Sequence, residues 1–151
     1  GCTQLYNFDL VYAHPGAFFQ TPFMPLGFVP EGGSSYTFPK LMGKQRANAL
    51  LLAGDRLSTQ EMYNAGLVTA VVPSETLDEF LEKGCEKTKR IAGFNDESLR
   101  MAKVLMKAAA GVEEQKEASR REGKDLLVRL NSEEGQASMK AFAEKSGGSK
   151  L

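Results

Sequence analysis

The chain has 151 residues, of which 42% are hydrophobic and 25% charged, so it can bury a core without help from disulfides or a metal. Its 19 basic and 19 acidic side chains cancel, which argues against a nucleic-acid partner, and no apolar run reaches the ~18 residues that a membrane span needs. Two cysteines and one histidine make neither a disulfide framework nor a zinc site, so we expect no metal.

The front of the chain predicts short strands and a shaped loop. Residues 8–13 are apolar and read as a short buried strand, which the turn residues 14–16 end. Residues 17–20 predict a second short strand. Residues 21–33 contain three prolines and three glycines, which predicts a loop of defined shape.

Helices and one more strand follow this loop. A helix is expected to begin near Ser34 and to end or be interrupted at Pro39. Residues 44–53 carry apolar side chains at helical spacing and predict a second helix. The sequence Ser58-Thr59-Gln60-Glu61 is a capping-box pattern that starts a third, short helix. Residues 67–72 are rich in β-branched side chains and predict a strand.

The remainder of the chain predicts four amphipathic helices. Apolar residues mark them at Leu77, Phe80, Leu81 and Ile91, at Leu99, Ala102, Met106 and Ala109, at Leu126, Leu127 and Leu130, and at Met139 and Phe142. Residues 113–124 mix charges of both signs and predict a solvated helix face. Since so few strands cannot form a stable sheet alone, they look like the end of a sheet that begins upstream.

The two ends of the chain carry further signals. Gly1 opens an ordered-looking segment without a secretory leader, so we expect a product from which an upstream portion is removed, or a fragment of a longer one. The chain ends in Ser149, Lys150 and Leu151, the tripeptide that a peroxisomal import receptor reads at a C-terminus. The sequence therefore predicts a peroxisomal location. The alternative is a coincidental ending on a frayed helix.

One acidic residue stands in the otherwise apolar loop. Glu31 follows Pro30 and precedes two glycines within the stretch PFMPLGFVPEGGSS at 22–35. Desolvation disfavours the charged form of a carboxylate, which is how a glutamate becomes a general base or acid near neutral pH. The glycines allow close approach of a ligand to amide hydrogens at a helix start. The alternative is a solvated glutamate that the helix dipole stabilises.

These segments resemble the crotonase (enoyl-CoA hydratase/isomerase) superfamily, and within it the peroxisomal Δ3,Δ2-enoyl-CoA isomerases. The resemblance covers nearly all of the chain, and PEGGSS is its most specific part. The matching segments are FDLVYA at 8–13, TPF at 21–23, LG at 26–27, PEGGSSYTFPK at 30–40, LLAGDRL at 51–57 and AGLVT to VP at 65–73.

The resemblance implies an α/β fold, namely the C-terminal portion of a crotonase-like (ClpP/crotonase) spiral fold with a few short strands followed by a helical region. Residues 1–73 would form the C-terminal part of the core with the active-site loop. Residues 74–145 would form a helical oligomerisation region, and residues 146–151 a flexible tail with the peroxisomal signal. Because such proteins form trimers or pairs of trimers, a homotrimer or hexamer is expected.

The resemblance also assigns a chemical role to Glu31. Hydratases of this superfamily use two other glutamates, and those positions are Thr3 and Phe23 here. The glutamate of the isomerases matches Glu31. It would take a proton from C2 of a 3-enoyl-CoA and return it to C4, giving a 2-enoyl-CoA for fatty-acid β-oxidation or a secondary-metabolite pathway. The CoA thioester is the substrate, and no separate cofactor is implied.

Other residues are candidates for substrate binding, with core packing or a solvated face as their alternatives. They are Phe23, Met24, Phe28 and Gly32 near the loop, with Phe18 and Phe19 beside them, and Phe142 and Lys145 on the last helix. In the superfamily two backbone amides form an oxyanion hole, and both would lie before or at Gly1. The alternative functions are therefore a hydratase-type crotonase and a truncated, non-catalytic subunit.

Overall fold

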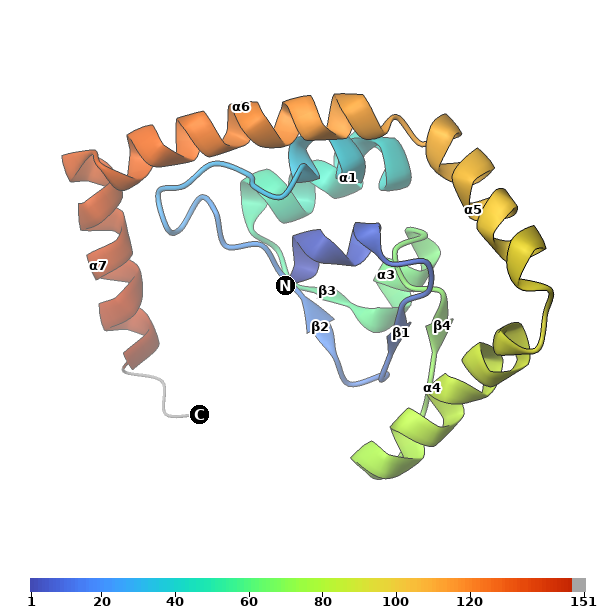
Figure 1. The fold of residues 1–151 in the computed structure, drawn as a ribbon. Coiled ribbons are helices and arrows are strands. Elements are labelled where there is room, and N and C mark those ends of the chain that lie inside the picture. Colours follow the sequence, from blue (N-terminus) through green and yellow to red (C-terminus); the bar gives the residue numbers. More distant parts are fainter. Residues whose placement is uncertain (148–151) are drawn as a thin grey trace.

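The computed structural model describes the backbone of residues 1–147 and the side chains of residues 1–145, so the tripeptide Ser149, Lys150 and Leu151 lies outside the described residues. Figure 1 shows a small inner core with long helices around it. The elements in chain order are the 3-10 helix η1 (Cys2–Asn7), β1 (Tyr12–Ala13), β2 (Phe18–Phe19), α1 (Ser34–Met42), α2 (Lys44–Asn48), the π-helix η2 (Ala49–Ala53), β3 (Leu57–Ser58), α3 (Thr59–Asn64), β4 (Ala70–Val71), α4 (Leu77–Ala92), α5 (Asp96–Ala109), α6 (Val112–Leu130) and α7 (Glu133–Gly147).

The strands form two minimal sheets. β1 pairs with β4 in parallel, and β2 pairs with β3 in the antiparallel sense. The predicted strand at 8–13 is confirmed only at its end, since Phe8 follows the 3-10 helix and is 62% exposed. Its amide hydrogen bonds to the carbonyl of Leu5 rather than to a neighbouring strand. A strand forms only where a partner takes its backbone groups, and β4 reaches only the last residues of this segment.

The core lies where α1, η2 and α3 meet the strands. Phe38, Leu50 and Met62 are completely buried at its centre. The prediction that Pro39 ends or interrupts α1 was wrong, because the helix continues to Met42. Phe38 and Met42 both pack into the core, and this burial offsets the single helix hydrogen bond that proline lacks.

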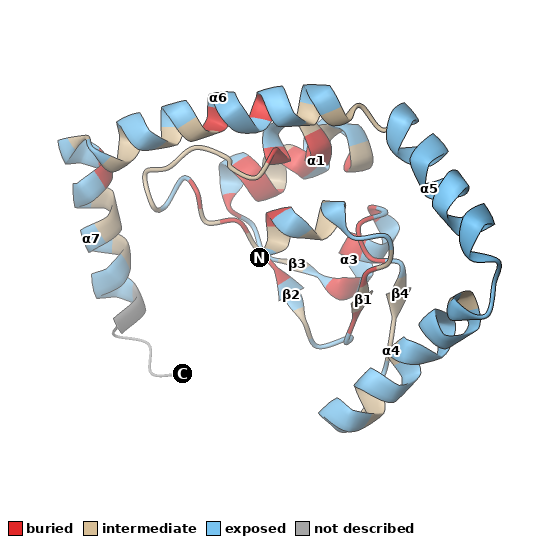
Figure 2. Cartoon of the chain, viewed as in Figure 1, coloured by how far each residue is buried: buried red, intermediate tan, exposed pale blue. Residues whose placement is uncertain are grey.

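The four C-terminal helices form an arc around this core (Figure 1). α6 lies across α1, while α4 and α5 contain no buried residue, as the absence of red from these two helices in Figure 2 shows. Most residues of the segment 113–124 are exposed, as predicted for a solvated helix face, but Ala118 and Glu122 on its other side are buried. None of the helices in residues 1–147 has the length and apolar character needed to cross a bilayer.

Candidate active site

The turn at Glu31 is built from two glycines in the left-handed region. Gly32 has φ +68° and Gly33 has φ +76°, where side-chain-bearing residues are strained. The turn brings the carbonyl of Glu31 onto the amide and the hydroxyl of Ser34, which donate to it at 3.1 Å and 2.6 Å. A Cβ atom at Gly32 would lie 3.1 Å from Thr3 Oγ1, so the glycine also allows η1 to approach closely.

The carboxylate of Glu31 is half-buried and held by a neighbouring hydroxyl. Thr3, which is 4% exposed, donates a hydrogen bond of 2.7 Å from Oγ1 to Glu31 Oε1. No hydrogen bond from the described part of the chain reaches Oε2. One carboxylate oxygen is therefore held by Thr3, whereas the other has no hydrogen-bond partner among the described residues.

A second carboxylate reaches the same loop from α6. Glu122 is 6% exposed, and its Oε2 accepts from the amide of Gly33 at 2.6 Å while its Oε1 accepts from the amide of Ser35 at 2.8 Å. Both of its oxygens are occupied by backbone donors. Glu31 is thus the carboxylate of this loop that retains an open oxygen.

The sequence analysis did not identify Glu122, although the spacing of residues on its helix could have indicated that it is buried. Gln115, Ala118 and Glu122 are spaced by three and four residues, and all are at least half-buried on the side of α6 that packs against α1. Because most side chains in this segment are charged, the sequence analysis did not recognise this spacing.

The candidate substrate-binding residues lie in different environments. Phe23 is buried in the core, Phe28 packs against it, and Met24 is 39% exposed. Phe142 is half-buried on α7, and Lys145 is exposed near the end of that helix. Gly32 follows Glu31 directly in the chain. The substrate-binding roles of all these residues stay predictions.

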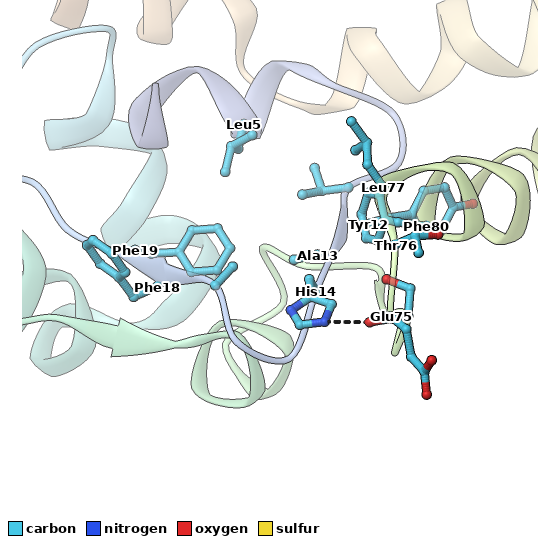
Figure 3. Close-up of a pocket in the computed structure, with 13 residues that line it drawn as sticks. Leu5, Tyr12, Ala13, His14, Phe18, Phe19, Glu75, Thr76, Leu77 and Phe80 are labelled. Carbon is cyan, nitrogen blue, oxygen red and sulfur yellow. Dashed lines mark hydrogen bonds between the residues drawn. The ribbon is translucent and has the colours of Figure 1, made fainter. Parts of the chain in front are cut away.

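Two apolar cavities lie beside the strands. The first has a volume of about 580 Å³, and residues of β1, β2 and α4 line it (Figure 3). At its rim His14 Nε2 hydrogen bonds to the carbonyl of Ser74. The second, of about 440 Å³, is lined by Cys2, next in sequence to Thr3, and it shares Phe18 and Phe19 with the first. Phe18 and Phe19 therefore border apolar pockets that are open to solvent, and Phe18 itself is 55% exposed.

The two cysteines are predicted to react at very different rates. Burial raises the pKa of the Cys2 thiol to about 11, whereas Cys85 is exposed on α4. Because only the thiolate attacks, we expect a disulfide reagent at pH 8 to modify Cys85 at least about 100-fold faster than Cys2. Peptide mapping after timed labelling measures both rates. Equal labelling would contradict a buried Cys2, and labelling in denaturant provides the control.

Among residues 1–145, no cluster of three or more histidine, cysteine, aspartate or glutamate side chains could hold a metal ion. The arrangement at this loop is a single carboxylate, Glu31, with the hydroxyl of Thr3 on one of its oxygens.

The comparisons with known proteins establish the family of this chain. The family model described as enoyl-CoA hydratase/isomerase matches residues 1–148. This chain belongs to the enoyl-CoA hydratase/isomerase family. Among solved structures, an enoyl-CoA hydratase/isomerase from Pseudoalteromonas atlantica superposes with a TM-score of 0.86 at 36% identity, covering 96% of this chain and 57% of that one. The fold is therefore a partial α/β crotonase fold, as the sequence predicts.

The curated relatives are named either as enoyl-CoA delta isomerases or as chromodomain proteins. The chain is 43% identical over 105 residues to enoyl-CoA delta isomerase 2 of Rattus norvegicus, covering 70% of this chain and 26% of the relative. It is 45% identical over 76 residues to the peroxisomal enoyl-CoA delta isomerase 3 of Mus musculus, covering 50% and 24%. It is also 37% identical over 136 residues to testis-specific chromodomain protein Y 1 of Homo sapiens, covering 90% and 24%. The chain spans about a quarter of the length of these relatives.

Proposed function

We propose that this chain carries the catalytic base of an enoyl-CoA isomerase, and that the base is Glu31. The observation that carries this proposal is the hydrogen bond from Thr3 to Glu31. By family resemblance, Thr3 stands where a hydratase has one of its two catalytic glutamates. A hydroxyl there can orient Glu31 but cannot activate water as a base. The isomerase names of the rat and mouse relatives support the same assignment.

The reaction needs one proton carrier. The open Oε2 of Glu31 removes a proton from C2 of a 3-enoyl thioester, and the electron pair of the broken C–H bond delocalises onto the thioester oxygen and C4. The protonated carboxyl then delivers the same proton to C4, so that the double bond moves from C3=C4 to C2=C3. Water must be kept away from the intermediate, and the partial burial of Glu31 supports this requirement.

Two other functions remain as alternatives, and each has its own test. A hydratase-type crotonase would convert a 2-enoyl-CoA into a 3-hydroxyacyl-CoA, so product analysis by mass spectrometry from both substrates separates it from an isomerase. The second alternative is a non-catalytic subunit. It would form oligomers in mass photometry but neither bind CoA in calorimetry nor convert either substrate.

We further propose that the protein acts in peroxisomes and assembles as a homotrimer or hexamer. The peroxisomal mouse relative and the C-terminal tripeptide support this location, in which β-oxidation or a secondary-metabolite pathway would supply the acyl-CoA. The import receptor would then be a partner. Deleting residues 149–151 from a fluorescent fusion should move it from peroxisomes to the cytosol, and unchanged peroxisomal fluorescence would count against the signal.

The hydroxyl of Thr3 is predicted to matter for turnover. Thr3→Val keeps the shape of the side chain but removes the hydrogen bond to Glu31, so we expect kcat to fall about ten-fold because the carboxylate loses its fixed orientation. Thr3→Ser keeps the hydroxyl and should retain most activity. Steady-state kinetics on a 3-enoyl-CoA measures both, and equal kcat values for the two variants would refute this role.

A further inference from the structure

The helix that follows the catalytic loop lacks a cap of its own. α1 begins after Gly33, which has no side chain to accept a hydrogen bond from the first free amides of the helix. In this protein the acceptor comes from α6, where Glu122 lies 89 residues further along the chain than Gly33. A buried carboxylate from a distant helix therefore takes the place of a local cap.

The contact of Glu122 is bidentate and charged. Its two oxygens receive the amides of Gly33 and Ser35 at 2.6 Å and 2.8 Å, distances typical of charge-assisted hydrogen bonds. Within residues 1–145, no lysine or arginine forms an ion pair with Glu122. The charge of this buried group is thus balanced by the amides and by the positive end of the α1 dipole.

The amides that Glu122 holds lie next to the catalytic residue. Gly33 is two residues after Glu31, and Ser34 between the two held amides donates to the carbonyl of Glu31. A Cβ atom at Gly33 would lie 2.9 Å from the side chain of Gln115, so α6 touches the loop directly. Movement of Glu122 would therefore move the backbone from which the Glu31 carboxylate projects.

We propose that Glu122 is a positioning residue for Glu31: from α6 it fixes the glycine turn and thereby directs the Glu31 carboxylate toward the substrate. The catalytic part of this inference rests on the proposed function. Glu122 does not itself exchange a proton with the substrate, because both of its oxygens are occupied. Its role also gives α6 a function at the active site besides packing.

The first test is amide hydrogen exchange, which does not require activity. Glu122→Gln keeps the size of the side chain but places an NH2 group against one of the two amides. We expect exchange at Gly33 and Ser35 to become about ten-fold faster by NMR, while distant core amides keep their rates. Glu117→Gln is the matched control, since Glu117 is exposed on the same helix and pairs with Arg120. Unchanged exchange at Gly33 and Ser35 would overturn the proposal.

The second test is kinetic. Glu122→Gln should lower kcat on a 3-enoyl-CoA by about 10- to 100-fold with KM unchanged, because small misplacement of a base slows chemistry more than binding. In a Glu31→Gln background the same change should lower kcat no further. Glu122→Asp keeps the charge but is too short to reach both amides, so it should fall between wild type and Glu122→Gln and serves if the glutamine variant does not fold.

The outcomes separate this inference from the proposed function. If Glu31→Gln abolishes activity but Glu122→Gln leaves kcat unchanged, the positioning role is wrong and the proposed function stands. A further fall of kcat in the double variant would also overturn it. If Glu31→Gln keeps full activity, or the wild-type chain has none, the proposed function fails, and the exchange rates of Gly33 and Ser35 alone decide whether Glu122 fixes the turn.

Discussion

Replacing Glu31 by glutamine is expected to lower kcat for the isomerisation of a 3-enoyl-CoA by about 10²- to 10⁴-fold, the range typical of a lost general base. The amide keeps the size of the side chain and can still accept from Thr3, so the loop should retain its shape. It cannot take up and return a proton. KM should change little, because the acyl-CoA is held by other groups.

The measurement is the rate of 2-enoyl-CoA formation under saturating substrate, combined with deuterium incorporation at C2 and C4. Glu86→Gln is a suitable control, since Glu86 is exposed on α4 and distant in sequence from the loop. Turnover of Glu31→Gln at the wild-type rate would remove Glu31 from the mechanism and with it the proposed isomerase.

The largest loss of stability is expected from truncating the centre of the core. Phe38 is completely buried on α1, where it packs among Leu50, Met62 and the other core residues. Phe38→Ala removes a whole ring and leaves a cavity that the surrounding helices cannot close. We expect the free energy of unfolding to fall by about 3–5 kcal/mol, a large fraction of the stability of a typical domain.

Chemical denaturation followed by circular dichroism measures this loss. Phe8→Ala is the matched control, because the same ring at position 8 is 62% exposed and its removal should change stability by less than about 0.5 kcal/mol. Similar midpoints for the two variants would show that the core is not centred on Phe38.

Patterns of a few consecutive residues were enough to predict some elements but not others. The capping box at Ser58 and Glu61 is confirmed, with Ser58 Oγ accepting from the amide of Glu61 and the Glu61 carboxylate accepting from the amide of Ser58. β3 was missed, because a two-residue strand has no periodicity to read. Its pairing with β2 is set by the fold around it and not by its own residues.

The family was predicted from the sequence, and the role of Glu31 stays a prediction. The PEGGSS segment identified Glu31 and the family, and the family match at residues 1–148 confirms the latter. The sequence did not indicate which residues hold Glu31 and its loop. Thr3 was noted only as a position that lacks a carboxylate, and Glu122 was placed on a solvated face. Nothing in the residues next to Thr3 or Glu122 indicates what they contact.

The sequence by itself determined the glycine turn, the lone acid in an apolar loop and the helical C-terminal region, because each depends on backbone preferences and side-chain spacing within a few residues. Only the tertiary structure decided that the hydroxyl of Thr3 binds Glu31 across 28 positions and that Glu122 caps α1 across 87 and 89. Such contacts form when η1 packs against the Glu31 loop and α6 against α1, and hydrogen bonds to a charged group are stronger in the low-dielectric interior than in water.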